Sequence, residues 1–295
     1  MVCDMKKKAV GLALLFLVYA LASILGVWMF VLLKEHMYFL VAILIADVIA
    51  TVFVWGCGVI LKTASTYDPY WSLQTFVIYI ALLFHFNNWS AYTIIPLIAI
   101  GLYSARLTAN FIAGFHDLSY VDWRYKMLKE KSGKLFQVVN LFGICMFPTI
   151  VVYAASVPLF IYSTNIGINY GWVDFIGSAI IFGGTLLELI SDLEMKKFIK
   201  IRKSRDEVIN IGLWKYSRHP NYLGEISIWF GVAFILIFSN PNNWYYLAGA
   251  FINLIMFMVI SIPMEEKHMK QYKPLIVEYI ETTSMLLILP RKRKK

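Results

Sequence analysis

The sequence predicts an all-α protein, a polytopic bundle of seven to eight transmembrane helices. Of the 295 residues, 60% are hydrophobic and only 15% are charged, which is too apolar for an ordinary soluble domain. The apolar residues lie in long runs that lack the alternation of barrel strands, and a helix satisfies its own backbone in lipid. Basic residues gather in alternate loops.

A helix of roughly 20 mainly apolar residues crosses a bilayer, and eight stretches of the chain come near that length. The two short stretches are expected to be tilted, partly re-entrant, or extended by polar ends that are buried against the bundle. In chain order, the predicted spans are 9–33, 37–61, 73–86, 91–112, 137–162, 170–190, 225–238 and 244–263.

The first predicted span starts after three lysines, as a signal peptide does. Its apolar run of about 25 residues exceeds the roughly 7 to 15 of a cleaved signal, so we interpret it as a retained span. The three cysteines give neither a metal-binding spacing nor a disulfide framework, and no metal site is expected.

The loops support an even number of spans with both termini in the cytoplasm. On that topology, the inner segments hold 25 of the 27 lysines and arginines, and only Lys34 and Arg106 lie elsewhere. The membrane would be the cytoplasmic membrane of a prokaryote or the endoplasmic reticulum of a eukaryote. We expect residues 1–295 to form a single membrane domain with a solvated basic tail at 291–295, near anionic lipid headgroups. A retention or partner signal is the alternative for this tail.

The net charge of +9 could suggest nucleic acid as a partner. A nucleic-acid surface needs a solvated basic face with stacking aromatics, whereas these aromatic residues lie inside apolar runs, so no nucleic-acid partner is expected.

Polar residues at membrane depth are costly and therefore mark candidate sites. Asp47 lies in the middle of the second span and is interpreted as a carboxyl that is hydrogen-bonded to a neighbouring helix. Asp68 precedes Pro69 at the start of the third span, which predicts an N-cap followed by the first helical residue.

Two neighbouring segments predict a polar cavity that opens toward the cytoplasm. Tyr103, Arg106 and Asn110 share one face of the fourth span, although an arginine there can also snorkel to the interface. The loop that follows carries Asp122, Trp123, Arg124 and Tyr125, a basic and aromatic rim.

The inner segment 191–224 is rich in charge. A solvated juxtamembrane helix accounts for Lys196, Lys197 and Lys203. Pro220 can start a helix, so the first-turn backbone donors and the Arg218 guanidinium would face one spot that suits phosphate oxygens. A capped helix entrance with a satisfied histidine is the structural alternative.

Four stretches carry a family resemblance: "DPYWSL", "ARLTAN", "DWRYKML" and "SRHPNYLGE". The last resembles the C-terminal motif of steroid 5-alpha-reductases, sterol reductases and isoprenylcysteine carboxyl methyltransferases. The first three favour the reductase branch, and the chain from about residue 45 onward is most similar to its bacterial-type relatives, the domain of unknown function DUF1295.

The resemblance implies a bundle of about seven helices that holds NADPH in a cavity open to the cytosol, with a lipid-like enone substrate entering from the membrane. Its catalytic pair, a helix-end carboxylate and a tyrosine, would be Asp68 and Tyr103, although the family's carboxylate is a glutamate. The implied cofactor-binding residues are Arg106, Asn110, Trp123, Arg124, Asp192, Arg202, Arg218, His219, Asn221, Tyr222 and Glu225.

The expected activity is therefore NADPH-dependent reduction of a carbon–carbon double bond conjugated to a ketone, in a steroid-like or other lipid. Such reduction needs a donor for the developing enolate oxygen, and a tyrosine backed by a carboxyl is one. Two alternatives are an S-adenosylmethionine-dependent methyltransferase, whose cofactor lacks phosphates and needs little positive charge, and a non-enzymatic lipid or sterol binder.

Overall fold

A computed structural model describes residues 2–292, with side chains from residue 5 onward. Within that range the regular secondary structure is helical and no strand forms, as the sequence predicts. The chain divides into two compact units, Met1–Ile168 and Asn169–Lys295. Whether they behave as the single domain expected from the sequence stays a prediction.

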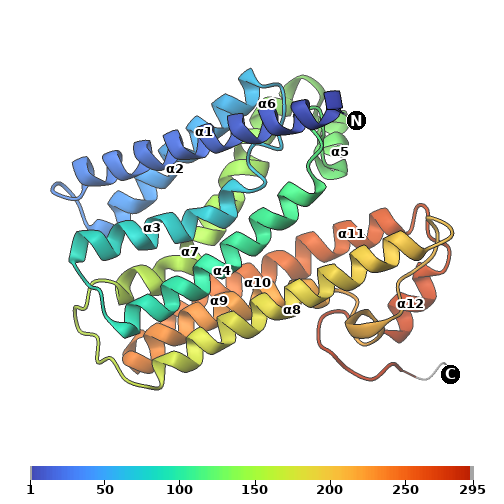
Figure 1. The fold of residues 1–295 in the computed structure, drawn as a ribbon. Coiled ribbons are helices and arrows are strands. Elements are labelled where there is room, and N and C mark those ends of the chain that lie inside the picture. The colour runs from blue at the N-terminus through green and yellow to red at the C-terminus, as the bar shows by residue number, and fades with distance from the viewer. Residues whose placement is uncertain (1, 293–295) are drawn as a thin grey trace. The chain divides into compact units, whose positions relative to one another are not determined.

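In the first unit, α1 (Val2–Leu33) packs along α2 (Phe39–Ile60), and α3 (Tyr70–Phe86) packs against α4 (Ala91–Gly114), as Figure 1 shows. The bounds of these helices match the first four predicted spans to within three residues, except that α1 begins seven residues before the predicted start at residue 9. Buried hydroxyl groups join the helices: Thr75 Oγ1 lies 2.6 Å from Ser156 Oγ of α7, and Ser104 Oγ donates to the carbonyl of Ser72 at 2.6 Å.

The fifth predicted span belongs to a longer helical stretch, 123–162. Its segments are α5 (Trp123–Ser132), η1 (Gly133–Leu135), α6 (Phe136–Val139), the π-helical η2 (Asn140–Met146) and α7 (Phe147–Tyr162). The stretch begins 14 residues before the predicted start at residue 137, because α5 is a charged helix that hydropathy does not register.

The second unit is built around α8 (Asp174–Ile201) and α9 (Pro220–Ser239), which pack along their lengths. The short span predicted at 225–238 starts at Pro220, with Asn221 and Tyr222 half-buried in its first turn and Glu225 buried, so it is extended by a polar end as expected. The remaining segments are η3 (Gly212–Lys215), η4 (Pro241–Tyr246), α10 (Leu247–Met256), the π-helical η5 (Phe257–Ser261), α11 (Ile262–Met269) and α12 (Ile276–Thr282).

Seven helical stretches within residues 2–292 are long and apolar enough to cross a membrane, which fits a multi-pass membrane protein. The α3 helix is shorter, at 17 residues. At 1.5 Å per residue it is roughly 25 Å long, against a hydrocarbon core of about 30 Å. The prediction of seven to eight spans is thus confirmed. The difference between seven and eight depends on whether α3 is counted as a span.

The basic tail begins as an anchored segment. Arg291 donates from Nε to Thr283 Oγ1 at 3.1 Å, from Nη2 to Thr282 Oγ1 at 2.9 Å and from Nη1 to Asn210 Oδ1 at 3.2 Å. Arg291 is therefore held by the fold while remaining half-exposed, and the solvated tail stays a prediction; residues 293–295 lie outside the described part of the chain.

Candidate functional site

The Asp68 carboxyl lies in the loop between α2 and α3, where it accepts a hydrogen bond from the Tyr125 hydroxyl of α5. Burial raises its pKa from the usual 3.8 to about 6, against the opposing effects of the Tyr125 hydrogen bond and the nearby Arg124 charge. A carboxyl in this state can hold or release a proton close to neutral pH.

The predicted N-cap role of Asp68 is wrong. The α3 helix begins one residue later than expected, at Tyr70, and Pro69 takes the N-cap position without a side-chain cap. The physical reason is a tight turn before the helix, closed by the Tyr70 amide donating to the Tyr67 carbonyl at 3.0 Å. This turn leaves the Asp68 carboxyl available to Tyr125.

The rim predicted at residues 122–125 is an N-capped helix start. Asp122 accepts from the backbone N–H of Arg124 at 2.9 Å, and its carboxylate also pairs with that guanidinium, Nε to Oδ1 at 2.8 Å and Nη2 to Oδ2 at 3.2 Å. Trp123 is the first residue of α5. The Arg124 charge is therefore balanced by its neighbour, which the sequence prediction of a positive rim did not include.

On α4, the predicted face is present. Tyr103 is fully buried, while Arg106 and Asn110 are half-buried one and two turns further along the helix. The hydroxyl that bonds Asp68 is that of Tyr125, so the pairing of Asp68 with Tyr103 stays a prediction.

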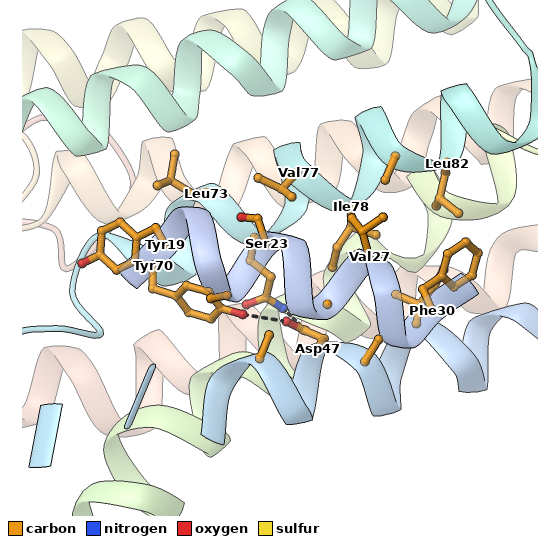
Figure 2. A pocket seen from close by; sticks show the side chains of 17 residues that line it. Tyr19, Ser23, Val27, Phe30, Asp47, Tyr70, Leu73, Val77, Ile78 and Leu82 are labelled. Atoms are coloured by element: carbon orange, nitrogen blue, oxygen red, sulfur yellow. Dashed lines mark hydrogen bonds between the residues drawn. The ribbon is translucent and has the colours of Figure 1, made fainter. Parts of the chain in front are cut away.

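Asp47 behaves as the sequence predicts. Its carboxyl oxygens accept hydrogen bonds from two side chains of α3, Gln74 Nε2 on Oδ2 and the Tyr70 hydroxyl on Oδ1, the latter at 3.4 Å. These residues lie at one side of a cavity between α1, α2 and α3, shown in Figure 2.

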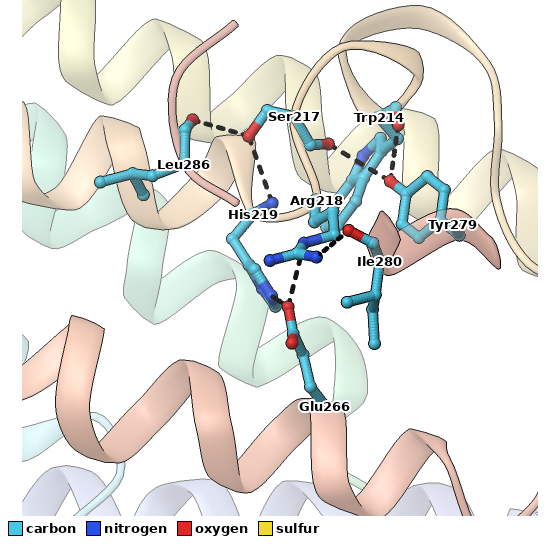
Figure 3. A network of polar contacts seen from close by, with 8 residues as sticks. All are labelled: Trp214, Ser217, Arg218, His219, Glu266, Tyr279, Ile280 and Leu286. Atoms are coloured by element: carbon cyan, nitrogen blue, oxygen red, sulfur yellow. Dashed lines mark hydrogen bonds and ion pairs between the residues drawn. The ribbon is translucent and has the colours of Figure 1, made fainter. Parts of the chain in front are cut away.

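In the second unit, the residues before α9 form a buried ionic cluster with α11 (Figure 3). Arg218 Nε and His219 Nε2 each lie 3.1 Å from Glu266 Oε1. Arg218 also donates from Nη1 to the Ile280 carbonyl, and its backbone N–H donates to the Ser284 carbonyl at 2.9 Å. The guanidinium predicted for phosphate is thus already paired with one carboxylate.

Glu266 is the functional candidate that sequence reasoning missed. The available signal was a pair of adjacent carboxylates, Glu265 and Glu266, at the start of the C-terminal segment. Such a pair ordinarily indicates a solvated helix end, and only the packing of α11 against the start of α9 makes Glu266 the partner of both Arg218 and His219.

The first turn of α9 carries the other predicted groups. The rings of His219 and Tyr222 stack 5.2 Å apart and nearly parallel, and Tyr222 also contacts Phe257. Glu225 is buried and accepts from Trp229 Nε1 at 2.8 Å. The Asn221 Oδ1 atom is buried and has no hydrogen-bond partner within residues 2–292.

The C-terminal part of α8 completes the set. Asp192 is half-buried, and Arg202 is the C-cap residue of the helix, also half-buried. Glu194, between them, accepts from the backbone N–H of Leu213 at 2.9 Å. Its carboxylate fills the place where a Cβ at Gly212 would lie, and Gly212 has a φ of +53°, so glycine is required there.

Comparison with known proteins gives a family and one uncharacterized relative. The sequence pattern of the family described as "Protein of unknown function (DUF1295)" matches residues 54–283. An uncharacterized protein of Schizosaccharomyces pombe is 24% identical over 217 residues, or 65% of this chain. That alignment spans 62% of the yeast protein's length. No solved structure matches the chain. Because the pattern covers most of the sequence, the chain belongs to the DUF1295 family.

Proposed function

We propose that this protein is a membrane-embedded, NADPH-dependent reductase of a carbon–carbon double bond conjugated to a ketone in a steroid-like or other lipid. The observation that carries the proposal is the Asp68 carboxyl, which has a pKa of about 6 and accepts from a tyrosine hydroxyl beside a membrane helix. It lies within the first of the three motifs whose resemblance favours the reductase branch of the superfamily.

Conjugate reduction builds negative charge on the carbonyl oxygen of the substrate, so the protein has to place a donor there. In the proposal, Tyr103 supplies that donor and Asp68 supports it, with Tyr125 holding the carboxyl in position. Raising the pKa of Asp68 matters because a protonated carboxyl can itself donate or pass on a proton.

The second unit holds groups that suit a nicotinamide cofactor. Arg218 is 7% exposed, with Nε beside Glu266 and Nη1 bonded to the Ile280 carbonyl, and a guanidinium donor fits a phosphate oxygen. The unpaired Asn221 Oδ1 is an acceptor that fits a carboxamide N–H or a ribose hydroxyl. A bound NADPH would supply the hydride. The remaining proposed contacts are Arg106, Asn110, Trp123, Arg124, Asp192, Arg202, His219, Tyr222 and Glu225.

Ligand-dependent thermal stability of the detergent-purified protein tests this proposal, because a ligand that binds only the native state raises its apparent stability. We expect NADPH to raise the melting temperature, and NADH and S-adenosylmethionine to have little effect. Tyr103→Phe should keep the NADPH shift but lose turnover of an enone lipid, since phenylalanine cannot donate to the enolate oxygen. Arg218→Ala should reduce the shift.

Removing Arg218 also leaves Glu266 without its cation, so two controls are needed. Arg218→Lys keeps a charge opposite Glu266 but loses the planar fork and should still weaken the NADPH shift. Lys215→Ala removes an exposed cation and should not change it. A shift with S-adenosylmethionine alone would instead favour a methyltransferase. No shift with any nucleotide would favour a non-enzymatic lipid binder, and full turnover by Tyr103→Phe would remove its catalytic role.

A further inference from the structure

A cavity of about 80 Å³ lies between α1, α2 and α3 of the first unit. In Figure 2, Tyr19, Ser23 and Val27 of α1 and Val77 and Ile78 of α3 border it. Most of its walls are aliphatic or small, and Val27 is 39% exposed, so the cavity reaches the surface of the unit. Because the surrounding helices are apolar enough to lie in a bilayer, the cavity is accessible to molecules dissolved in the membrane.

Gln74 lines this cavity and is only 4% exposed, yet its Oε1 atom has no hydrogen-bond partner within residues 2–292. The orientation of the amide is fixed by its other end. Nε2 donates to Asp47 Oδ2 and lies 3.4 Å from the Thr149 carbonyl, and both of these are acceptors. Flipping the amide would put oxygen against oxygen, so Oε1 remains the unpaired atom.

The unpaired Gln74 Oε1 is an acceptor, so a ligand that satisfies it must carry a hydrogen-bond donor. A buried acceptor without a donor costs free energy that a ligand hydroxyl can recover. Of the other polar groups at the cavity, Tyr19 donates to the Thr66 carbonyl at 2.8 Å and Tyr70 donates to Asp47, whereas the Ser23 hydroxyl can donate or accept. A ketone cannot donate a hydrogen bond, whereas an alcohol can.

We propose that this cavity binds the hydroxyl end of a neutral lipid alcohol, with the hydroxyl donating to Gln74 Oε1. The cavity is smaller than the roughly 150 Å³ that holds a benzene ring in an engineered apolar cavity. It therefore takes the polar end and the first carbons, and the rest of the ligand lies outside it in the bilayer. The site is independent of the proposed reaction, because an enone has no donor for Gln74.

Photolabelling in lipid nanodiscs tests the proposal. The probe is a long-chain primary alcohol that carries a diazirine near the hydroxyl and a terminal alkyne, and the matched probe is its methyl ether. We expect the alcohol to label peptides from 19–30 and 70–82 at least about fivefold more than the ether, the factor that one unsatisfied buried acceptor supplies. Excess unlabelled alcohol should compete.

Two variants with matched controls decide the outcome. Gln74→Leu should remove the preference for the alcohol, whereas Thr75→Val, which removes a neighbouring hydroxyl paired with Ser156, should keep it. Gly26 lines the cavity, and a Cβ there meets Ala50 at an ordinary 3.6 Å, so Gly26→Leu should fill the space and abolish labelling without relying on the Gln74–Asp47 pair. The control is Gly56→Leu on α2, where a Cβ meets open space, and this variant should still be labelled.

Equal labelling by alcohol and ether would overturn the proposal and leave the cavity to water, which also supplies donors. Labelling that survives Gly26→Leu would overturn it as well, since the probe would then bind elsewhere. Each variant is compared only if it elutes as a monodisperse peak with a cooperative melting transition.

Discussion

At the scale of single residues, the Asp68 carboxyl makes the stability of the protein depend on pH. Its pKa is about 6 in the folded chain and 3.8 without burial. Between these values the unfolded chain releases the proton and the folded chain keeps it, so stability is highest at low pH and is lost as pH rises through about 6. Wild type should lose this contribution between pH 4 and pH 7, whereas Asp68→Asn has no proton to release there. We therefore expect the difference in melting temperature, variant minus wild type, to rise by a few degrees from pH 4 to pH 7.

Two substitutions check the physical cause. Because the Tyr125 hydrogen bond lowers the pKa of Asp68, Tyr125→Phe should raise that pKa further and extend the loss of stability to higher pH. The pKa of Asp117 is shifted in the opposite direction, because hydrogen bonds from Ser119 lower it. Asp117→Asn should therefore reduce the stability of the protein only at pH values above the folded pKa of Asp117. A pH profile for Asp68→Asn that parallels wild type would contradict the assignment.

At the scale of elements, the contact between α8 and α9 depends on glycines. A Cβ at Gly184 would lie 2.6 Å from the Gly224 carbonyl and 2.7 Å from Ile228, so the helices would have to separate. We expect Gly184→Ala to lower stability by about 1–3 kcal/mol. Gly183→Ala, where a Cβ meets open space, should be neutral or slightly stabilising. Chemical denaturation in mixed micelles measures both, and equal effects would show that close approach does not decide the packing.

The helices themselves could largely be predicted from the sequence, because bilayer thickness fixes the length of an apolar run. The errors fall where helices leave the apolar region. The α5 segment and the end of α8, beyond residue 190, are charged and continue as helix beyond the predicted spans. Hydropathy does not detect such extensions, and the late start of α3 depends on a local turn at Tyr67 that no periodic pattern contains.

The candidate site could be predicted only in part, for a similar reason. Motif residues such as Arg218 and His219 were identified within one short stretch, whereas their partner Glu266 lies 47 residues beyond His219. The hydrogen bond to Asp68 was likewise not predicted, since its donor Tyr125 is 57 residues away on another helix. Local sequence gives the chemical groups, but their pairing is decided by tertiary packing.

At the scale of the whole molecule, the basic loops predict that α3 crosses the membrane despite its 17 residues. If it crosses and the N-terminus is cytoplasmic, the loops around Trp89 and Ile166 lie outside, and α5 with Lys126 and the loop with Lys203 lie in the cytoplasm. If it does not cross, all four exchange sides. In a chain expressed in a bacterial inner membrane with Cys3, Cys57 and Cys145 replaced, a membrane-impermeant maleimide should label Trp89→Cys and Ile166→Cys in cells with a permeable outer membrane. It should reach Lys126→Cys and Lys203→Cys only after lysis, and the reverse pattern would reduce the bundle to seven spans.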